Sequence, residues 1–491
     1  MNTRIDLISL GKKNTSREAM ELINKTGLRA VAVVDKNKKL IGLVTDGDIR
    51  RSLLAGKEKN ALLGEIMKKS PIAALENTPA TELFETMLKS GTHEIPLVDK
   101  NGILKGITFF SDLKSIPLSS PDITSREVEV INNVLATPFL SIGPEVKKFE
   151  KRMADYIGVK YAIAVNSGTS GLHLCIKSMG IKDGDEVITT PFSFIASSNC
   201  ILFERAKPVF VDIDEKTLNI DVSKIEEKIT KKTKAILPVH IFGQPCQMDK
   251  IMEIAKKYNL FVIEDACEAI GAEYKNKKVG SFGNAGVFAF YPNKQITTAE
   301  GGMVVTNDQK IAKLCQSMRN QGRDEDDSEL RHTMLGYNYR MIEMSAALGL
   351  AQMERISEIL LKRQKAAELY NNKLRAIEGI DIPQVAPGVK MSWFVYVVRL
   401  DKNIFGVAER NSVIRKLREK GINCRSYFPP IHLEPFYADK FSQKKGSFPV
   451  TEEIAGLTIA LPFYNNITEK QVEYISETLS SILKKERAKK L

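Results

Sequence analysis

One lysine of this 491-residue chain stands where it could be withdrawn from water. The apolar run 286–290 precedes Lys294, and the small-residue stretch 297–302 follows it. Burial lowers the pKa of a lysine, and the neutral amine that results is a nucleophile toward carbonyl groups. Most lysines are solvated surface residues. Lys294 therefore indicates this chemistry only if other parts of a carbonyl-processing site accompany it.

Two acidic residues follow a predicted buried strand. The strand 261–264 leads into Asp265, and Glu268 follows three residues later. Ligands of open α/β sheets bind at the carboxyl ends of the strands. An aspartate at that edge can pair with a cationic ring nitrogen, although it can equally cap a helix.

A turn of small residues follows another predicted strand. The strand 161–165 leads into Asn166-Ser167-Gly168-Thr169-Ser170-Gly171, and a predicted helix comes next. The amides and the positive dipole end of a helix start suit an anion such as a phosphate. Many turns of this composition bind nothing. Gly168 and Thr169 are thus candidate phosphate ligands that need support from other motifs.

The first 115 residues contain a repeat at an offset of 64 residues, in which Val34-Asp35-Lys36-Asn37 recurs as Val98-Asp99-Lys100-Asn101. Each copy is predicted to contain a helix, a strand, a tight turn, a second strand and an acidic helix start. Thr45 and Asp48 of the first copy could bind the phosphate and ribose of a nucleotide, or they could only cap a helix. The second copy keeps Asp112 but has Phe109 in place of Thr45.

The remainder of the chain must position these residues. Apolar strands alternate with amphipathic helices from about residue 122, which predicts a mostly parallel sheet covered on both faces. A strand, a helix and further strands after about residue 393 predict a smaller α+β lobe. The segment 116–121 is rich in Pro and Ser and reads as a linker. We therefore expect an α/β protein with domains at 1–115, 122–390 and 391–491.

Together these segments resemble known families. The N-terminal repeat looks like a tandem pair of cystathionine-β-synthase-type (CBS) domains. The lysine, acidic and phosphate segments resemble the pyridoxal-phosphate-dependent sugar aminotransferases of the DegT/DnrJ/StrS type, which have the aspartate aminotransferase fold (fold type I). Further segments occur in the family's order: Ser141-Ile142-Gly143-Pro144-Glu145, Pro191-Phe192-Ser193-Phe194, Pro238-Val239-His240, Gly336-Tyr337-Asn338-Tyr339-Arg340 and Phe428-Pro429-Pro430-Ile431-His432.

The resemblance implies pyridoxal 5'-phosphate as the cofactor. Lys294 would bind it covalently and then move a proton between substrate and cofactor. Asp265 would keep the ring nitrogen protonated, so that the ring works as an electron sink. The remaining contacts would come from Phe194, which stacks on the ring, from Gly168 and Thr169 at the phosphate, and from Asn338, which reaches the phosphate from the neighbouring subunit of a homodimer or a higher homo-oligomer.

Two positions depart from the pattern of many relatives. By the resemblance, Glu268 would stand near the ring hydroxyl, where many family members have Gln or His, and a carboxylate there would raise the pKa of the ring oxygen. Ala289 stands where they have a phosphate-binding Ser. The resemblance also places His432 near the substrate. For His432 and for His240, we expect either a substrate contact or a structural hydrogen bond.

Composition excludes several other classes of protein. The net charge of +12 fits anionic ligands such as nucleotides, but no helix concentrates basic residues with interleaved aromatics as nucleic-acid binding requires. The six cysteines are scattered and the histidines lack metal-ligand spacing. We therefore expect reduced thiols in the cytoplasm and no metal site. No apolar stretch is long enough to predict a membrane span.

The resemblance implies an aminotransferase that moves an amino group from L-glutamate to an NDP-keto-deoxysugar for surface glycan or polysaccharide biosynthesis. A 4-keto-6-deoxy sugar is the first expectation and a 3-keto sugar the second. The CBS pair would sense an adenine nucleotide. One alternative is a sugar dehydratase, which has His in place of the lysine, so Lys294 argues against it. Another is a sensor with a non-catalytic lobe, and intact Lys294 and Asp265 argue against that.

Overall fold

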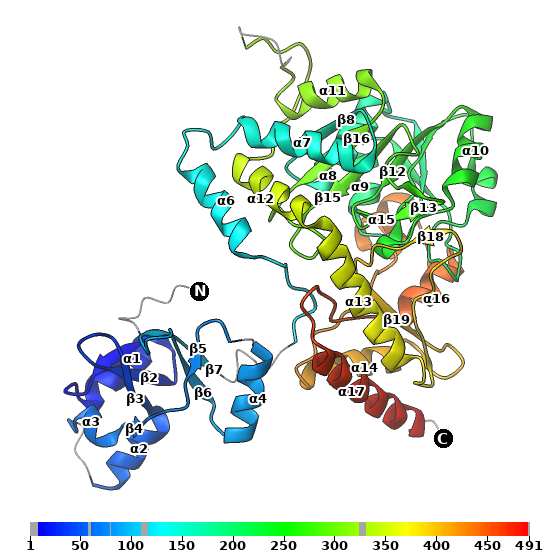
Figure 1. The fold of residues 1–491 in the computed structure, drawn as a ribbon. Coiled ribbons are helices and arrows are strands. Elements are labelled where there is room, and N and C mark those ends of the chain that lie inside the picture. The colour runs from blue at the N-terminus through cyan, green and yellow to red at the C-terminus, as the bar shows by residue number, and fades with distance from the viewer. Residues whose placement is uncertain (1–7, 57–59, 79, 110–115, 324–329, 490–491) are drawn as a thin grey trace. The chain divides into compact units, whose positions relative to one another are not determined.

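The structure of the chain is a computed structural model that describes residues 8–56, 60–78, 80–109, 116–323 and 330–489 (Figure 1). Internal contacts divide it into two compact units, Met1–Ile116 and Pro117–Leu491. The predicted linker 116–121 and the predicted lobe boundary at residue 390 stay predictions.

Each half of the N-terminal unit is built on an antiparallel strand pair. β2 (Ala30–Val34) pairs with β3 (Leu40–Thr45), and β6 (Glu94–Val98) pairs with β7 (Leu104–Phe109). Both pairs have the same register and the same irregularity beside the turn, so the sequence repeat is a structural repeat. The remaining elements are β1 (Ser9–Gly11), α1 (Ser16–Thr26), α2 (Asp46–Leu54), α3 (Leu63–Ile66), β4 (Lys68–Lys69), β5 (Ala74–Leu75) and α4 (Ala80–Ser90).

The two repeats meet at their turns. The amide of Leu40 donates to the carbonyl of Gly102, and the amide of Leu104 donates to the carbonyl of Lys38, both at 3.0 Å. Leu104 is fully buried and shares a small apolar core with Ala32 of the first repeat. The two copies therefore fold as one unit.

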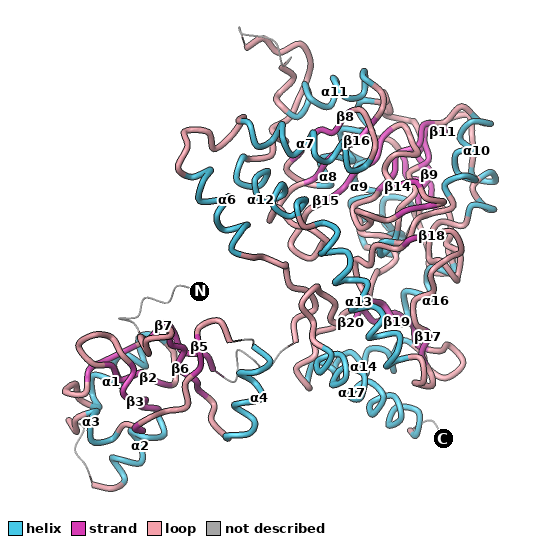
Figure 2. The backbone as a smooth tube through the Cα atoms, in the orientation of Figure 1, coloured by secondary structure: helices cyan, strands magenta, loops and turns pink. Residues whose placement is uncertain are grey.

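A seven-stranded sheet forms the centre of the second unit, and its strands are magenta in Figure 2. The order is β10-β9-β11-β12-β15-β16-β8. All neighbours are parallel except the two pairs that β16 makes, which confirms the predicted mostly parallel sheet. The strands are β8 (Tyr161–Val165), β9 (Glu186–Thr189), β10 (Lys207–Phe210), β11 (Thr233–Ile236), β12 (Phe261–Asp265), β15 (Ala285–Ala289) and β16 (Gly302–Thr306).

Helices cover both faces of this sheet. Side chains alternate along a strand, so Ile163 and Val165 of β8 join one apolar cluster while Ala162 and Ala164 join another. This two-sided burial explains why the strands are apolar throughout rather than alternating. The helices are α6 (Ser125–Leu135), α7 (Pro144–Ile157), α8 (Gly168–Ser178), α9 (Ala196–Phe203), α10 (Met248–Tyr258), α11 (Gln309–Arg319), α12 (Glu343–Glu354) and α13 (Ile356–Leu374).

The C-terminal part has the predicted α+β character. β17 (Ile380–Asp381), β19 (Tyr396–Leu400) and β20 (Thr458–Leu461) form an antiparallel sheet. The buried guanidinium of Arg363 on α13 donates to the carbonyls of Trp393 and Phe394 at 2.8 Å, which fixes the entry to β19. The other elements are β13 (Glu273–Tyr274), β14 (Lys277–Lys278), β18 (Val389–Lys390), α14 (Val407–Glu419), α15 (Pro435–Phe441), α16 (Pro449–Leu457) and α17 (Glu469–Ala488), with short 3-10 turns that include Ile241–Gly243 and Ile431–Leu433.

Candidate active site

Lys294 lies in a buried place after strand β15. Its side chain is 13% exposed, and Nζ lies 3.4 Å from Glu268 Oε1. The ammonium also stands 4.0 Å from the centre of the Phe394 ring, whose negative face attracts a cation. The lysine is therefore withdrawn from water and held between a carboxylate and an aromatic ring.

Asp265 is fixed at the carboxyl end of β12. The hydroxyl of Ser197 donates to its Oδ2 at 2.7 Å, and the amide of Cys267 donates to its Oδ1 at 3.2 Å. The residue is buried, and its backbone pairs with the segment after β11. A buried carboxylate with both oxygens oriented is suited to one cationic partner at the edge of the sheet.

Glu268 is held by a backbone donor and faces the lysine. Its Oε2 accepts from the amide of Phe242 at 3.0 Å, so Oε1 is left toward Lys294. Burial raises the pKa of Glu268, and the nearby Lys294 charge opposes that shift. The carboxyl group therefore takes up a proton more readily than an ordinary glutamate.

Gly168 at the start of α8 and Gly302 at the start of β16 are packed too tightly for any larger side chain. A Cβ on Gly168 would lie 2.7 Å from Ala289 Cβ and 2.9 Å from Cys267 Sγ. A Cβ on Gly302 would lie 2.6 Å from the carbonyl of Ser167. The ends of β12, β15 and β16 thus form a cradle below the first amides of α8, where an anion binds favourably. Thr169 is half-buried at this helix start.

Phe194 and Asn338 are connected to the same centre through other residues. Phe194 is 60% exposed, and its carbonyl accepts from the amide of Ser197, whose hydroxyl donates to Asp265. The side-chain amide of Asn166 donates to the carbonyl of Asn338 at 3.3 Å, next to the cradle. Asn338 itself is exposed.

His240 makes structural hydrogen bonds, which is one of the two predicted alternatives. The side chain is fully buried, and Nδ1 accepts from the amide of Cys246 at 3.0 Å. Nε2 therefore carries the proton and donates to Glu264 Oε2 at 3.1 Å. Glu264 also accepts hydrogen bonds from backbone amides of the turn 280–283. The predicted substrate contact of His240 is thus not supported, since no face of the ring is accessible.

His432 is enclosed as well. Its side chain is fully buried, Nε2 lies 3.0 Å from Glu452 Oε1, and the ring packs edge-on against Phe448. Burial lowers the pKa of His432, although Glu452 opposes the shift. Its neighbour Ile431 donates to the carbonyl of Pro191, so this segment supports the one that carries Phe194. A direct substrate contact is closed to His432 in this structure.

Thr45 and Asp48 of the N-terminal unit form the cap of α2. Asp48 Oδ2 accepts from the amide and the hydroxyl of Thr45 at 2.9 and 2.8 Å, while Thr45 Oγ1 accepts from the amide of Asp48. Arg51 adds an ion pair of 2.6 Å. Phe109 is buried in a core with Ala30, and Asp112 lies outside the described residues. The helix-cap alternative therefore accounts for the contacts of both residues, and a ligand would have to share them.

Four residues of this centre carried no recognised signal in the sequence. Ser197 lies one helical turn after Phe194 and therefore on the same side of the segment. This spacing could have indicated that Ser197 also faces the site and contacts Asp265. Cys267 lies between the two acids and could have been noticed as a wall of the cradle. Phe242 and Phe394 come from remote segments, so only the fold brings them to Glu268 and Lys294.

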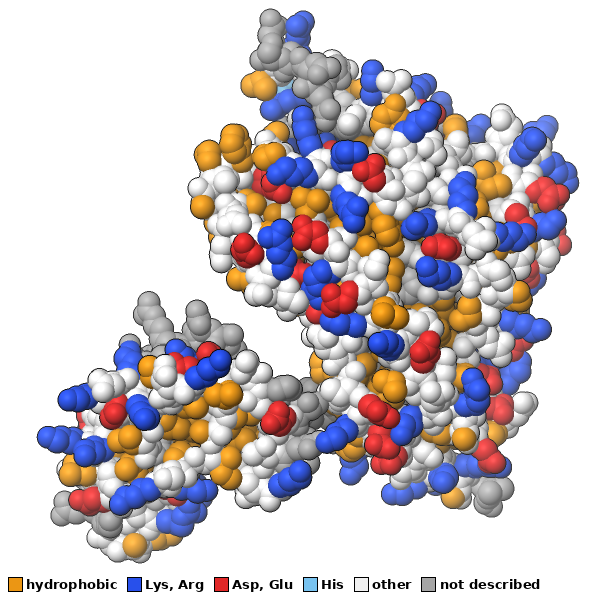
Figure 3. Space-filling model, in the orientation of Figure 1, with side chains coloured by type: hydrophobic (Ala, Val, Ile, Leu, Met, Phe, Trp, Pro, Cys, Tyr) orange, Lys and Arg blue, Asp and Glu red, His pale blue; other side chains and the backbone are white. Residues whose placement is uncertain are grey.

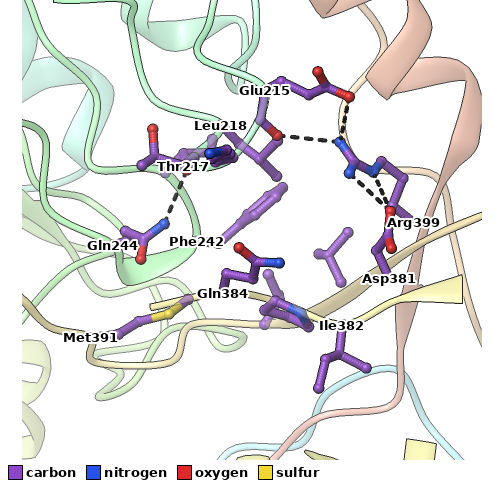
Figure 4. A pocket seen from close by; sticks show the side chains of 15 residues that line it. Glu215, Thr217, Leu218, Phe242, Gln244, Asp381, Ile382, Gln384, Met391 and Arg399 are labelled. Carbon is purple, nitrogen blue, oxygen red and sulfur yellow. Dashed lines mark hydrogen bonds and ion pairs between the residues drawn. The ribbon is translucent and has the colours of Figure 1, made fainter. Parts of the chain in front are cut away.

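Phe242 also lines a separate pocket (Figure 4). Arg399 in this pocket is paired with Asp381 at 2.9 Å and donates to the carbonyl of Glu215 at 3.2 Å. The side-chain amide of Gln244 donates to the carbonyl of Thr217. None of the predicted cofactor residues lines this pocket, so it is distinct from the centre around Lys294.

Within the described ranges, no helix has both the length and the apolar content to cross a membrane. In the same ranges no three His, Cys, Asp or Glu side chains gather as a metal ion would need.

Comparison with known proteins identifies both units. The family model of the DegT/DnrJ/EryC1/StrS aminotransferase family matches residues 121–480, and the CBS domain model matches residues 1–55 and 63–116. The chain is 40% identical to GDP-perosamine synthase of Caulobacter vibrioides, over 76% of this chain and 100% of that protein. It is 36% identical to the spore coat polysaccharide biosynthesis protein SpsC of Bacillus subtilis, over 75% and 97%.

A solved structure has the same fold in the second unit. It is Helicobacter pylori PseC, an aminotransferase involved in the biosynthesis of pseudoaminic acid, with a TM-score of 0.72 and 29% identity over 76% of this chain and 100% of that one. The glycine cradle, the fixed Asp265 and the buried Lys294 fit pyridoxal 5'-phosphate. The chain therefore belongs to the DegT/DnrJ/EryC1/StrS aminotransferase family and is a pyridoxal-phosphate-dependent sugar aminotransferase of fold type I with an N-terminal CBS pair.

Proposed function

We propose that this enzyme transfers the amino group of L-glutamate to the keto carbon of a nucleoside-diphosphate deoxysugar, with a 4-keto-6-deoxy sugar first and a 3-keto sugar second. The observation that carries the proposal is the buried pair of Lys294 and Glu268 beside the fixed Asp265. A lysine in such surroundings can exchange protons with a bound substrate without competition from water.

Each predicted residue has a defined task in this proposal. When bound, the cofactor supplies an electron sink for the carbon that exchanges its amino group. Asp265 would keep a proton on the ring nitrogen, and Ser197 and the Cys267 amide hold its carboxylate in place. Gly168 and Thr169 would hold the phosphate at the start of α8, and the exposed Phe194 would contact the ring.

Lys294 holds and moves the proton of the reaction. Its Nζ would move a proton between the cofactor and the substrate carbon that exchanges its amino group. This requires one fixed position for the amine. Glu268 and the Phe394 ring define that position from two sides. Because the Phe242 amide occupies Oε2 of Glu268, only Oε1 is available to the lysine.

Relatives and charge support the proposed choice of sugar. Two relatives, at 40% and 38% identity, carry the name GDP-perosamine synthase, so a GDP-linked sugar is the first substrate to test. The net charge of +12 favours an anionic diphosphate. The product would enter surface glycan or polysaccharide biosynthesis. We place the enzyme in the cytoplasm, because its six cysteines are free and five of them are buried.

A homodimer with shared active sites belongs to the proposal. Apolar side chains are exposed around the loop between α6 and α7, where Figure 3 shows hydrophobic atoms, and Phe139, Leu140 and Ile142 are among them. The backbones of Ser141 and Ile342 form an isolated antiparallel β-bridge, and Ile342 is also exposed. These residues therefore form one apolar patch. Patches of this kind mark protein contacts. The exposed Asn338 would reach the phosphate site of the partner across such an interface.

Regulation by the CBS pair completes the proposal. A nucleotide at Thr45 and Asp48 would replace part of the hydrogen bonding that now caps α2. Binding would be coupled to activity only if the nucleotide prefers one of two conformations, which is usually worth about 1–3 kcal/mol. The first repeat is the proposed site, because the phenyl ring of Phe109 cannot bind a phosphate.

A panel of amino donors tests whether L-glutamate is the donor in the first half of the reaction. Purified enzyme is incubated with L-glutamate, L-glutamine, L-aspartate or L-alanine, and the 2-oxo acid released in one turnover is measured. We expect 2-oxoglutarate in amounts equal to the active sites and none from Lys294→Ala. Release from L-alanine but not from L-glutamate would refute the proposed donor.

A further inference from the structure

The segment Tyr337–Tyr339 turns its two tyrosines inward. Their rings stack at 4.9 Å with planes 10° apart, and both pack against His173 of helix α8. Side chains alternate along an extended segment, so Asn338 between them faces the opposite way and is exposed. The direction of Asn338 is therefore set by how its two neighbours are held.

A directional chain of hydrogen bonds holds Tyr339. Its hydroxyl lies 3.1 Å from His173 Nδ1, and His173 Nε2 lies 2.8 Å from Glu204 Oε1. Burial lowers the pKa of His173. For Glu204, burial raises the pKa, but hydrogen bonds from Lys177 and His173 outweigh burial and lower it overall. The histidine is thus neutral and the glutamate charged. Nε2–H donates to the carboxylate, and Nδ1 accepts from the Tyr339 hydroxyl.

Backbone contacts tie the same segment to the phosphate cradle. The amide of Asn166 donates to the carbonyl of Tyr339 at 2.8 Å, and its side chain donates to the carbonyl of Asn338. Asn166 is the first residue of the turn that leads into α8. His173 lies on the same helix, so α8 carries both a phosphate site at its start and the support of the Asn338 segment along its side.

We infer that Tyr339, His173 and Glu204 are positioning residues that direct Asn338 to the cofactor phosphate bound in the neighbouring subunit. The inference rests on the proposed function in its dimeric form. Fixing an exposed residue from inside suits this task, because a phosphate contact requires placement within about 0.5 Å. Removing the Tyr339 hydroxyl would leave Nδ1 of His173 buried without a partner and loosen the segment.

A double-mutant cycle tests the inference. The affinity of the apoenzyme for pyridoxal 5'-phosphate is titrated by protein fluorescence in the wild type, Tyr339→Phe, Asn338→Ala and the double variant. We expect Tyr339→Phe alone to weaken binding about 5- to 30-fold and to change it less than about twofold in the Asn338→Ala background. Tyr474→Phe, which removes an exposed hydroxyl that donates to the Lys420 carbonyl, is the matched control and should not change affinity.

The outcomes separate this inference from the proposed function. If Asn338→Ala weakens binding but Tyr339→Phe adds its full effect in that background, Tyr339 acts only on its own subunit and the inference is overturned. If Asn338→Ala leaves the affinity unchanged, the shared active site fails as well. If sedimentation shows that Tyr339→Phe no longer forms a dimer, Glu204→Gln replaces it in a second double-mutant cycle. It should couple to Asn338→Ala in the same sense, and an additive result there also overturns the inference.

Discussion

Lys294 Nζ and Glu268 Oε1 lie 3.4 Å apart at a place where both side chains are withdrawn from water. The carboxyl group of Glu268 is buried with a raised pKa and is held by the Phe242 amide. This pair gives the lysine one fixed position, on which the predictions about catalysis depend.

Replacement of Lys294 by arginine should abolish transamination and leave folding largely intact. Arginine keeps the positive charge beside Glu268, but it stays protonated and cannot attack a carbonyl. Amino-group transfer and thermal unfolding of Lys294→Arg are compared with those of Lys313→Arg, a conservative change on the exposed side of α11. Substantial turnover by Lys294→Arg would show that another residue does the chemistry.

Asp265→Asn should lose most of the activity, about 100-fold or more. A neutral amide cannot stabilise a protonated ring nitrogen, although it keeps the size of the side chain and one acceptor for Ser197. Steady-state rates are measured at saturating cofactor beside Asp439→Asn, which lies on an exposed helix position. Near-normal rates would mean that Asp265 serves only as a structural cap.

Gly168→Ala should weaken cofactor binding by at least about tenfold. The added methyl would lie 2.7 Å from Ala289 Cβ, which is anchored on a central strand and cannot move aside, so the cradle must shift. Gly106→Ala is a matched control, because its nearest neighbour would be 3.9 Å away. Fluorescence titration of the two apoenzymes checks the difference. Equal affinities would contradict the placement of the phosphate at the start of α8.

Nucleotide binding to the CBS pair should depend on Asp48. Calorimetry with AMP, ADP and ATP is carried out on the full chain, on Asp48→Ala and on Asp112→Ala. We expect binding to be lost in Asp48→Ala and kept in Asp112→Ala, because only the first repeat offers a hydroxyl at the phosphate. No binding at millimolar nucleotide would refute the sensing role, and the opposite pattern would assign the second repeat.

Glu127 should stabilise the second unit in a pH-dependent way. Its buried carboxylate binds Thr124, Arg355 and Gln352, and although burial opposes them, these hydrogen bonds lower its pKa to about 2. A lowered carboxyl pKa adds stability above the unfolded pKa of about 4.5, and that stability is lost as the pH falls toward 2. Glu127→Gln should therefore cost about 2–3 kcal/mol in urea unfolding of the apoenzyme at pH 7. Most of the difference should vanish near pH 3, and a constant difference would rule out the titration of Glu127 as its source.

Local patterns were enough to predict the parallel sheet and to single out Lys294 and Asp265 as candidate site residues. Both residues follow apolar runs, and the carboxyl ends of parallel strands meet at one edge whatever the details of packing. His240 shows where such reasoning stops. Its partner Glu264 is 24 residues away, and the sequence cannot say which of the two sides of a strand end a ring will face. Phe242 and Phe394 were missed for a similar reason, because their contacts with Glu268 and Lys294 exist only after the remote segments pack.

Amination of a nucleotide-linked keto sugar tests the central claim most directly. GDP-, dTDP- and UDP-linked 4-keto-6-deoxyhexoses and a 3-keto analogue are incubated with L-glutamate and enzyme, and the products are identified by mass spectrometry. The proposed function predicts an amino sugar from at least one 4-keto substrate, with the GDP-linked sugar first and with no product from Lys294→Arg. A dehydrated sugar, or no amino product from any keto sugar in an enzyme that releases 2-oxoglutarate from glutamate, would contradict it.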